Sequence, residues 1–201
     1  PDAQAVPEQN EVEAAPQQNS DPKEVPSADV SPATKPKPEF QLADNLDGLL
    51  EQLARTRDIN RAKRVEQRIW ELWRGSDSKS IDLLTGWARK AMGAKKFNQA
   101  LDLLDQVVVL RPNYAEAWNQ RATLHFMMQD YNKSIADIER TLALEPRHFG
   151  ALAGLAYILE RIGQKKRALD VWYRALRVYP AMKSGQDSIL RLEEELAGAK
   201  L

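Results

Sequence analysis

Three prolines in the second half of the chain, Pro112, Pro146 and Pro180, are evenly spaced. The other eight prolines of this 201-residue chain lie at or before Pro38. A fixed period of about 34 residues indicates a repeat array, in which each unit is one supersecondary element that cannot bury its apolar face alone. The spacing therefore predicts that units of equal length stack on one another.

Placing each proline at position 32 of a unit gives three units, 81–114, 115–148 and 149–182. Position 8 is alanine in every unit, position 20 is alanine or serine, and positions 28 and 30 are aliphatic. Small residues recur where two helices approach closely, and large residues recur where helices interlock. These columns predict that each unit is a pair of packed helices.

The apolar residues within the units follow a helical period. In residues 165–178 they fall at i, i+1, i+4, i+7 and i+8, which is one stripe along a helix: Ala168, Leu169, Trp172, Ala175 and Leu176. No segment alternates convincingly with period two, so the sequence predicts an all-α fold without strands.

One unit, 115–148, carries a recognisable pattern, with Trp118, Ala122, Asp130-Tyr131, Ile135, Leu142 and Pro146 at its defining positions. This pattern resembles the tetratricopeptide repeat (TPR) family. The resemblance implies that each unit has two antiparallel helices, A and B. It also implies that the stacked units form a right-handed α-solenoid, whose concave groove is lined by the A helices.

Residues 41–80 resemble a degenerate TPR-like helical hairpin. They contain two apolar stripes separated by Asp58-Ile59-Asn60, but Arg74 stands where the closing proline would be. After the last unit, residues 183–201 are expected to hold a C-terminal capping helix at about 185–198. A repeat array needs such a polar-backed helix over its last apolar face, and Ser184 with Asp187 would form a capping box at its start.

Residues 1–40 differ sharply in composition from the rest. They hold eight acidic and three basic residues, a net charge of −5, which leaves +5 for the remainder of this neutral chain. This leader is rich in Pro, Gln and Ala, has no aromatic residue before Phe40, and is expected to be disordered. It would serve as a tether, or it would be inert. Neither part has the one-sided charge of a nucleic-acid binder.

The residues needed for catalysis are scarce. The chain has no cysteine, its two histidines are well separated in sequence, and no HExxH, phosphate-binding glycine loop or nucleophile elbow is present. We therefore expect no enzyme activity, no metal, no cofactor, no small-molecule substrate and no nucleic-acid partner. No stretch approaches the roughly 18–20 apolar residues of a membrane span, so any membrane contact would be indirect.

The TPR resemblance implies that positions 2, 5, 9, 12 and 13 of each unit face the concave groove. The candidate partner-binding residues at these positions are Thr85, Arg89, Met92, Asn119, Thr123, Phe126, Met127, Ala153, Tyr157 and Arg161. We hypothesise that the groove binds a peptide or helix of another protein. Its methionines and aromatic rings would form an adaptable apolar floor, and Gly150, Ala153 and Gly154 would leave space above it. In the alternative interpretation, Phe126 and Met127 only pack against the neighbouring unit.

One TPR subclass binds the acidic C-terminal tail of cytosolic chaperones through a clamp of Lys, Asn and Arg on successive A helices. The corresponding positions here hold Thr85, Arg89, Gln120, Gly150 and Gly154. The clamp therefore does not map onto this chain.

Several unusual residues carry structural expectations. Arg121 occupies a core position and should reach an acid such as Asp137 or point into the groove. His125 is expected to be a packed ring, and His148 to be solvated. The five tryptophans are expected mostly in the core: Trp70, Trp73, Trp87, Trp118 and Trp172.

The leading functional hypothesis is a non-catalytic interaction scaffold that resembles small exported, periplasmic TPR proteins of Gram-negative bacteria and acts in envelope assembly or maintenance. The start at Pro1, the absence of cysteine and the long polar leader favour export to the periplasm. The alternative is a cytoplasmic co-chaperone or specialised chaperone that masks an apolar segment of a client. A third hypothesis is weak self-association through repeat faces.

Overall fold

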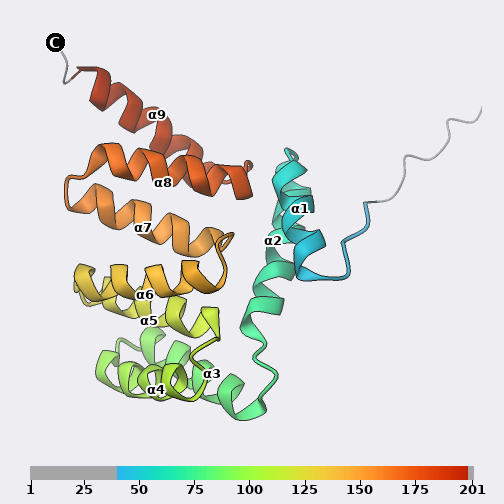
Figure 1. Cartoon of the computed structure of the whole chain (residues 1–201), viewed down its shortest axis with the longest axis vertical. Coiled ribbons are helices and arrows are strands. Elements are labelled where there is room, and N and C mark those ends of the chain that lie inside the picture. The colour runs from blue at the N-terminus through green and yellow to red at the C-terminus, as the bar shows by residue number, and fades with distance from the viewer. Residues whose placement is uncertain (1–39, 199–201) are drawn as a thin grey trace, which may run out of the picture. The chain divides into compact units, whose positions relative to one another are not determined.

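A computed structural model describes residues 40–198, which fold into nine α-helices without any strand (Figure 1). The all-α prediction is confirmed for this part of the chain. The predicted leader, apart from its last residue, lies outside the described residues.

Six helices form the three predicted units as A and B pairs. They are α3 (Lys79–Gly93) with α4 (Phe97–Leu110), α5 (Ala115–Met127) with α6 (Tyr131–Leu144), and α7 (Phe149–Arg161) with α8 (Lys165–Val178). Pro112, Pro146 and Pro180 each lie in the connection that follows a B helix. The prolines thus end successive helix pairs, as their spacing predicted.

The same turn joins A to B in all three units. Lys95, Gln129 and Gly163, which occupy the same position of successive units, all have positive φ angles of 58–79°. The following residue donates its N–H to a carbonyl five residues earlier, at 2.8–2.9 Å, which is the bond that closes a helix C-terminus. Only the third unit uses glycine, the residue that adopts this conformation without strain.

Small residues let the two helices of each unit approach. Ala100, Ser134 and Ala168 are at most 1% exposed. The Ser134 hydroxyl donates a 2.7 Å hydrogen bond to the Ala122 carbonyl on the facing A helix. The serine in this column is therefore satisfied without disturbing the close contact.

The C-terminal helix α9 (Lys183–Gly198) packs on α8 through Ile189 and Leu192. It begins two residues earlier than expected, so Ser184 lies inside the first turn and the proposed capping box is wrong. Close approach requires Gly185, because a Cβ there would lie 2.9 Å from Leu176 Cδ2.

The N-terminal hairpin, α1 (Leu46–Arg55) with α2 (Ile59–Arg74), does not continue the stack onto α3. Its leucines and tryptophans share a core with α7 and α8 instead. The Trp73 ring stacks on His148 with centroids 4.0 Å apart and planes 10° apart. The Tyr179 hydroxyl donates to Glu66 at 2.9 Å, and burial together with this bond raises the pKa of Tyr179.

His148 is completely buried, so the expectation that it is solvated was wrong. Its Nδ1 accepts a 3.1 Å hydrogen bond from the Ala151 N–H and caps α7. The proton therefore sits on Nε2, which lies 3.3 Å from a Glu116 carboxylate oxygen on α5 and donates to it. The His148 imidazole thus contacts α5, α7 and the N-terminal hairpin at the same time.

Position 7 of the second unit holds Arg121 instead of the leucine typical of the family, and this arginine is the centre of an ion cluster. Arg121 donates to both carboxylate oxygens of Asp137, at 2.7 and 2.8 Å, and to Asp105 at 2.8 Å. The expected contact with Asp137 is confirmed. His125, 5% exposed, packs beside this cluster as predicted, with Nε2 3.8 Å from Asp137 Oδ2.

The exposed fraction of these tryptophans depends on where the N-terminal hairpin packs. Trp172 is fully buried and Trp73 is 7% exposed, but Trp87 on α3 is 51% exposed. The core assignment of Trp87 was wrong, because the hairpin that would have covered α3 packs against α7 and α8.

The hairpin contact can be tested with two tryptophan substitutions. Trp73→Ala should lower the free energy of unfolding by about 3–5 kcal/mol, since it empties a packed aromatic site. Trp87→Ala should change it by no more than about 0.5 kcal/mol, because that ring is half exposed. Urea denaturation followed by circular dichroism measures both, and trypsin should cleave the hairpin faster only in Trp73→Ala. Equal effects of the two substitutions would contradict this packing.

The burial of His125 predicts a pH dependence of stability. Burial lowers the pKa of His125 below 6.5, and the Asp137 carboxylate offsets this only in part. The unfolded chain, with an ordinary pKa, therefore binds the proton at higher pH than the folded chain. Stability should be full above pH 6.5 and should fall as the pH drops through the folded pKa.

His125→Phe, which keeps a ring at this site, should lose less stability than the natural chain between about pH 7.5 and about pH 5.5. Urea midpoints at the two pH values give the comparison. Parallel pH profiles would show that His125 does not contribute.

Candidate functional site

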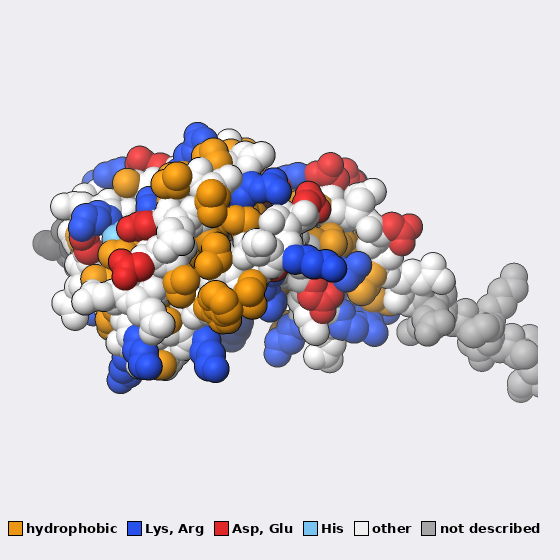
Figure 2. All heavy atoms as spheres, turned by 90° about the horizontal axis from the view of Figure 1, so that it is seen from below, with side chains coloured by type: hydrophobic (Ala, Val, Ile, Leu, Met, Phe, Trp, Pro, Cys, Tyr) orange, Lys and Arg blue, Asp and Glu red, His pale blue; other side chains and the backbone are white. Residues whose placement is uncertain are grey.

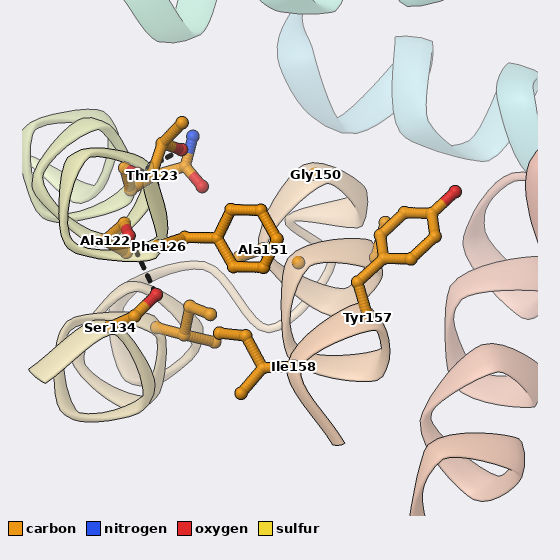
Figure 3. A pocket seen from close by; sticks show the side chains of 12 residues that line it. Ala122, Thr123, Phe126, Ser134, Gly150, Ala151, Tyr157 and Ile158 are labelled. Atoms are coloured by element: carbon orange, nitrogen blue, oxygen red, sulfur yellow. Dashed lines mark hydrogen bonds between the residues drawn. The ribbon is translucent and has the colours of Figure 1, made fainter. Parts of the chain in front are cut away.

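An apolar pocket of about 270 Å³ opens between the A helices α5 and α7 (Figure 3). Five of the predicted partner-binding residues line it: Asn119, Thr123, Phe126, Ala153 and Tyr157. The structure thus brings together half of the predicted set, from two neighbouring repeats.

The pocket exists because α7 is poor in side chains where α5 carries a large one. The Phe126 ring is directed from α5 toward α7 (Figure 3). On α7, Ala153 and Gly154 leave room opposite the ring, and a Cβ at Gly154 would meet only Ile138 Cδ1 within 4 Å, at 3.6 Å. A small-residue segment facing an aromatic ring therefore leaves a hollow.

Tyr157 forms another part of the lining and is held from behind. Its ring packs edge-on against Trp172, with centroids 4.8 Å apart, while 41% of the residue stays exposed. A partly exposed aromatic ring with a fixed position is suited to contact a partner at low entropic cost.

The polar groups around the pocket are used inside the protein. The Thr123 hydroxyl donates to the Asn119 carbonyl at 2.9 Å, and the Asn119 amide donates to Glu116 at 2.9 Å. Glu116 also accepts from the Gln120 amide at 3.0 Å. The pocket therefore offers mainly hydrocarbon to an incoming group.

The hairpin covers the concave surface at the start of α7. A Cβ at Gly150 would lie 2.6 Å from Trp70 Cη2, so the open space predicted at Gly150 is filled by the chain itself. Gly150 also lines the pocket, so Trp70 lies against one of its lining residues.

The other five predicted residues lie outside this pocket. Thr85 is 1% exposed and its hydroxyl donates to the Ile81 and Asp82 carbonyls, and Met92 is 9% exposed. Both are therefore poorly placed to touch a partner. Arg89, Met127 and Arg161 are exposed on the A helices, and their role in binding stays a prediction.

The sequence did not indicate the contribution of Trp70, because its contact with Gly150 joins two residues that are far apart along the chain. Of the residues expected to form the floor, Phe126 and Tyr157 line the pocket, whereas Met92 and Met127 do not. By contrast, the sequence could predict that Ala153 and Gly154 lie near Phe126, because their positions within the repeat units place them on neighbouring A helices.

No helix in residues 40–198 combines the length and the apolar character that a membrane crossing requires. Within the same residues, no three metal-ligating side chains of His, Asp or Glu come together.

Comparison with known proteins gives consistent results. A family model described as tetratricopeptide repeat matches residues 115–148. A TPR repeat-containing protein of Rhizobium etli is 47% identical over 153 residues, which cover 76% of this chain and 75% of the relative.

Two solved structures share the fold at low identity. The first TPR of Spaghetti (RPAP3), bound to the HSP90 peptide SRMEEVD, has a TM-score of 0.57 at 17% identity and covers 60% of this chain and 95% of its own. The Yersinia enterocolitica type III secretion chaperone SycD, in complex with a peptide of the translocator YopD, has a TM-score of 0.53 at 15% identity, covering 61% and 94%. With the extensive match to the Rhizobium etli protein, these findings show that the chain belongs to the tetratricopeptide repeat family.

Proposed function

We propose that this protein is a non-catalytic scaffold that holds a segment of a partner protein against its A helices. One apolar side chain of the partner enters the pocket between α5 and α7. The observation that carries the proposal is the pocket itself, where Phe126 on α5 lies opposite Ala153 and Gly154 on α7, Tyr157 of α7 adds a second ring, and the neighbouring polar atoms are already bonded internally.

The size of the pocket favours a side chain over a small molecule. Its volume of about 270 Å³ lies just below the range of roughly 300–1,000 Å³ found for small-molecule sites. A helix or extended peptide that places one anchor in a hydrophobic groove is a common mode of recognition. We therefore expect an apolar anchor on a longer segment.

The wall formed by Trp70 restricts where that segment can lie. It blocks the beginning of α7 at Gly150, so the segment must extend from the pocket toward the C-terminal ends of α5 and α7. Met127 and Arg161 are exposed at those ends. They would contact residues of the partner that flank the anchor.

An acidic C-terminal tail does not suit this surface. Of the positions where a carboxylate clamp would need donors, Thr85 is buried, Gln120 is bonded to Glu116, and Gly150 is covered by Trp70. The Glu116 carboxylate adds negative charge there, which disfavours a second carboxylate. The RPAP3 domain holds its peptide on a similar fold, and this supports peptide binding in general but not the same ligand.

We further propose the bacterial envelope as the setting, with the scaffold acting in the periplasm in assembly or maintenance. The absence of cysteine supports this. The second candidate is a cytoplasmic co-chaperone, which the SycD and RPAP3 complexes favour because both hold peptides of other proteins. Osmotic-shock fractionation of native cells distinguishes the two settings: release with periplasmic markers supports the envelope, and retention with the cytosol supports the co-chaperone.

Filling the pocket should abolish capture of the anchor. We expect peptides selected from a random displayed library to share one large apolar residue and to bind Ala153→Phe at least about tenfold more weakly, which is about 1.4 kcal/mol. The control is Ala143→Phe, which makes the same change at an exposed alanine of α6. Fluorescence anisotropy measures affinity and circular dichroism checks folding. Equal affinities for both variants would refute the pocket assignment.

The peptide SRMEEVD tests the co-chaperone alternative directly. Because Arg89 is the single cation among the clamp positions and Thr85, Gln120, Gly150 and Gly154 supply none, it should bind no better than a scrambled peptide of the same composition, at any salt concentration. Sequence-dependent binding by titration calorimetry would favour the co-chaperone and would argue against our proposal for this groove.

A further inference from the structure

A second apolar surface lies at the end of the array, on the side of the first repeat that faces away from the stack. Leu83 and Trp87 on α3 are each 51% exposed, and Leu110 on α4 is 61% exposed. We call this surface the end face. Figure 2, which looks at the molecule from the α3–α4 end, shows apolar side chains gathered in the middle with both basic and acidic side chains around them.

The end face is uncovered because the N-terminal hairpin packs elsewhere. In a repeat array each inner unit is covered by both neighbours, and a terminal unit needs a cap. Here α9 caps the last repeat. Helices α1 and α2 contact α7 and α8 instead, so the side of α3 that faces away from the stack stays exposed. The surface of α3 therefore has the character of an interior repeat contact.

The exposed side of α3 has the pattern of a helix-packing seam. Ser80, Leu83, Trp87, Lys90 and Ala94 follow one another at intervals of three, four, three and four residues, and all are exposed. This spacing presents one straight stripe to a partner helix. A shallow hollow beside Trp87 continues the stripe toward α4, lined by Ala91 and Gln99.

The rim of the end face is positively charged. Lys79, Lys90 and Lys96 are exposed there, and none of them forms an ion pair within residues 40–198. Two end faces brought together would place these lysines against each other, which like-charge repulsion disfavours. The partner surface should be apolar in the middle and acidic around it.

The outer side of α9, at the opposite end of the array (Figure 1), has this chemistry. Leu190 is 61% exposed, and Asp187 and Glu194 lie three and four residues from it on the same side of the helix. Asp187 is paired with Lys183 at 2.6 Å, and Glu193 accepts a hydrogen bond from the Tyr173 hydroxyl on α8. Glu194 has no ion pair within the described part of the chain. An apolar residue among acids at one end thus matches an apolar patch among lysines at the other.

We propose that the end face of one molecule binds the outer side of α9 of a second copy, head to tail. Helix α9 follows the B helix α8 and so stands where the next A helix of a solenoid would stand. Leu190 packs between Leu83 and Trp87, and the acids of α9 face the lysine rim. The contact extends the array from one molecule to the next.

This arrangement is heterologous, so each molecule keeps one free surface of each kind after pairing. Such contacts give open chains unless their rotation closes a ring. Since few apolar side chains take part and the charged groups are exposed to solvent, we expect weak association that increases with protein concentration and decreases with salt.

Two complementary variants of the full chain distinguish this interface from others. Trp87→Glu damages the end face and Leu190→Lys damages α9, and both residues are at least half exposed, so folding should be unaffected. In sedimentation velocity the natural chain should increase in mean mass with concentration, while each variant alone stays monomeric. Their equimolar mixture should form dimers and nothing larger, since only one good pair of surfaces remains.

The control is Ile162→Lys, at another exposed apolar residue in the α7–α8 turn, which should associate like the natural chain. Glu194→Lys should weaken association, as should added salt. A natural chain that is monomeric at every concentration would overturn the proposal. Association that survives Leu190→Lys would overturn it as well, because it would point to pairing of two end faces. Peptide binding in the α5–α7 pocket should be unchanged in Trp87→Glu, so the two proposals fail independently.

Discussion

The contact between Trp73 and His148 determines how the N-terminal hairpin is used. A fully buried imidazole that caps α7, donates to Glu116 and stacks on an indole leaves no polar atom of its ring unsatisfied. Separating the hairpin from the third repeat would expose this ring and the aromatic residues around it. The hairpin is therefore bound to α7 and α8 by packing and hydrogen bonding that a stack onto α3 would not provide.

Two surfaces follow from that one contact. With the hairpin at α7, Trp70 covers Gly150, one of the residues that line the pocket between α5 and α7. With the hairpin absent from α3, Leu83 and Trp87 stay exposed at the start of the array. A TPR array of regular stacking would have had a longer groove and a covered first repeat.

The repeat architecture could be predicted because it is local and periodic. Three evenly spaced prolines and columns of small residues determine where helices end and where they approach, and each unit is built from contacts within its own helix pair. The pocket was partly predictable for the same reason, since Phe126 and Tyr157 occupy equivalent faces of neighbouring units. His148 and Trp87 were misassigned because their environments depend on the hairpin, whose packing partners α7 and α8 are distant along the chain and leave no periodic signal.

Charge then decides what the exposed end of the array can bind. Hydrophobic contact alone would allow two end faces to pair, because a Leu and Trp patch has no direction. The unpaired lysines around it make that pairing unfavourable, whereas the acids beside Leu190 on α9 make the head-to-tail pairing favourable. The capping helix therefore differs from an inert cap: it covers α8 with Ile189 and Leu192 and presents an apolar, acidic side to solvent. A helix that served only to end the array would have no need for a leucine on its outer side.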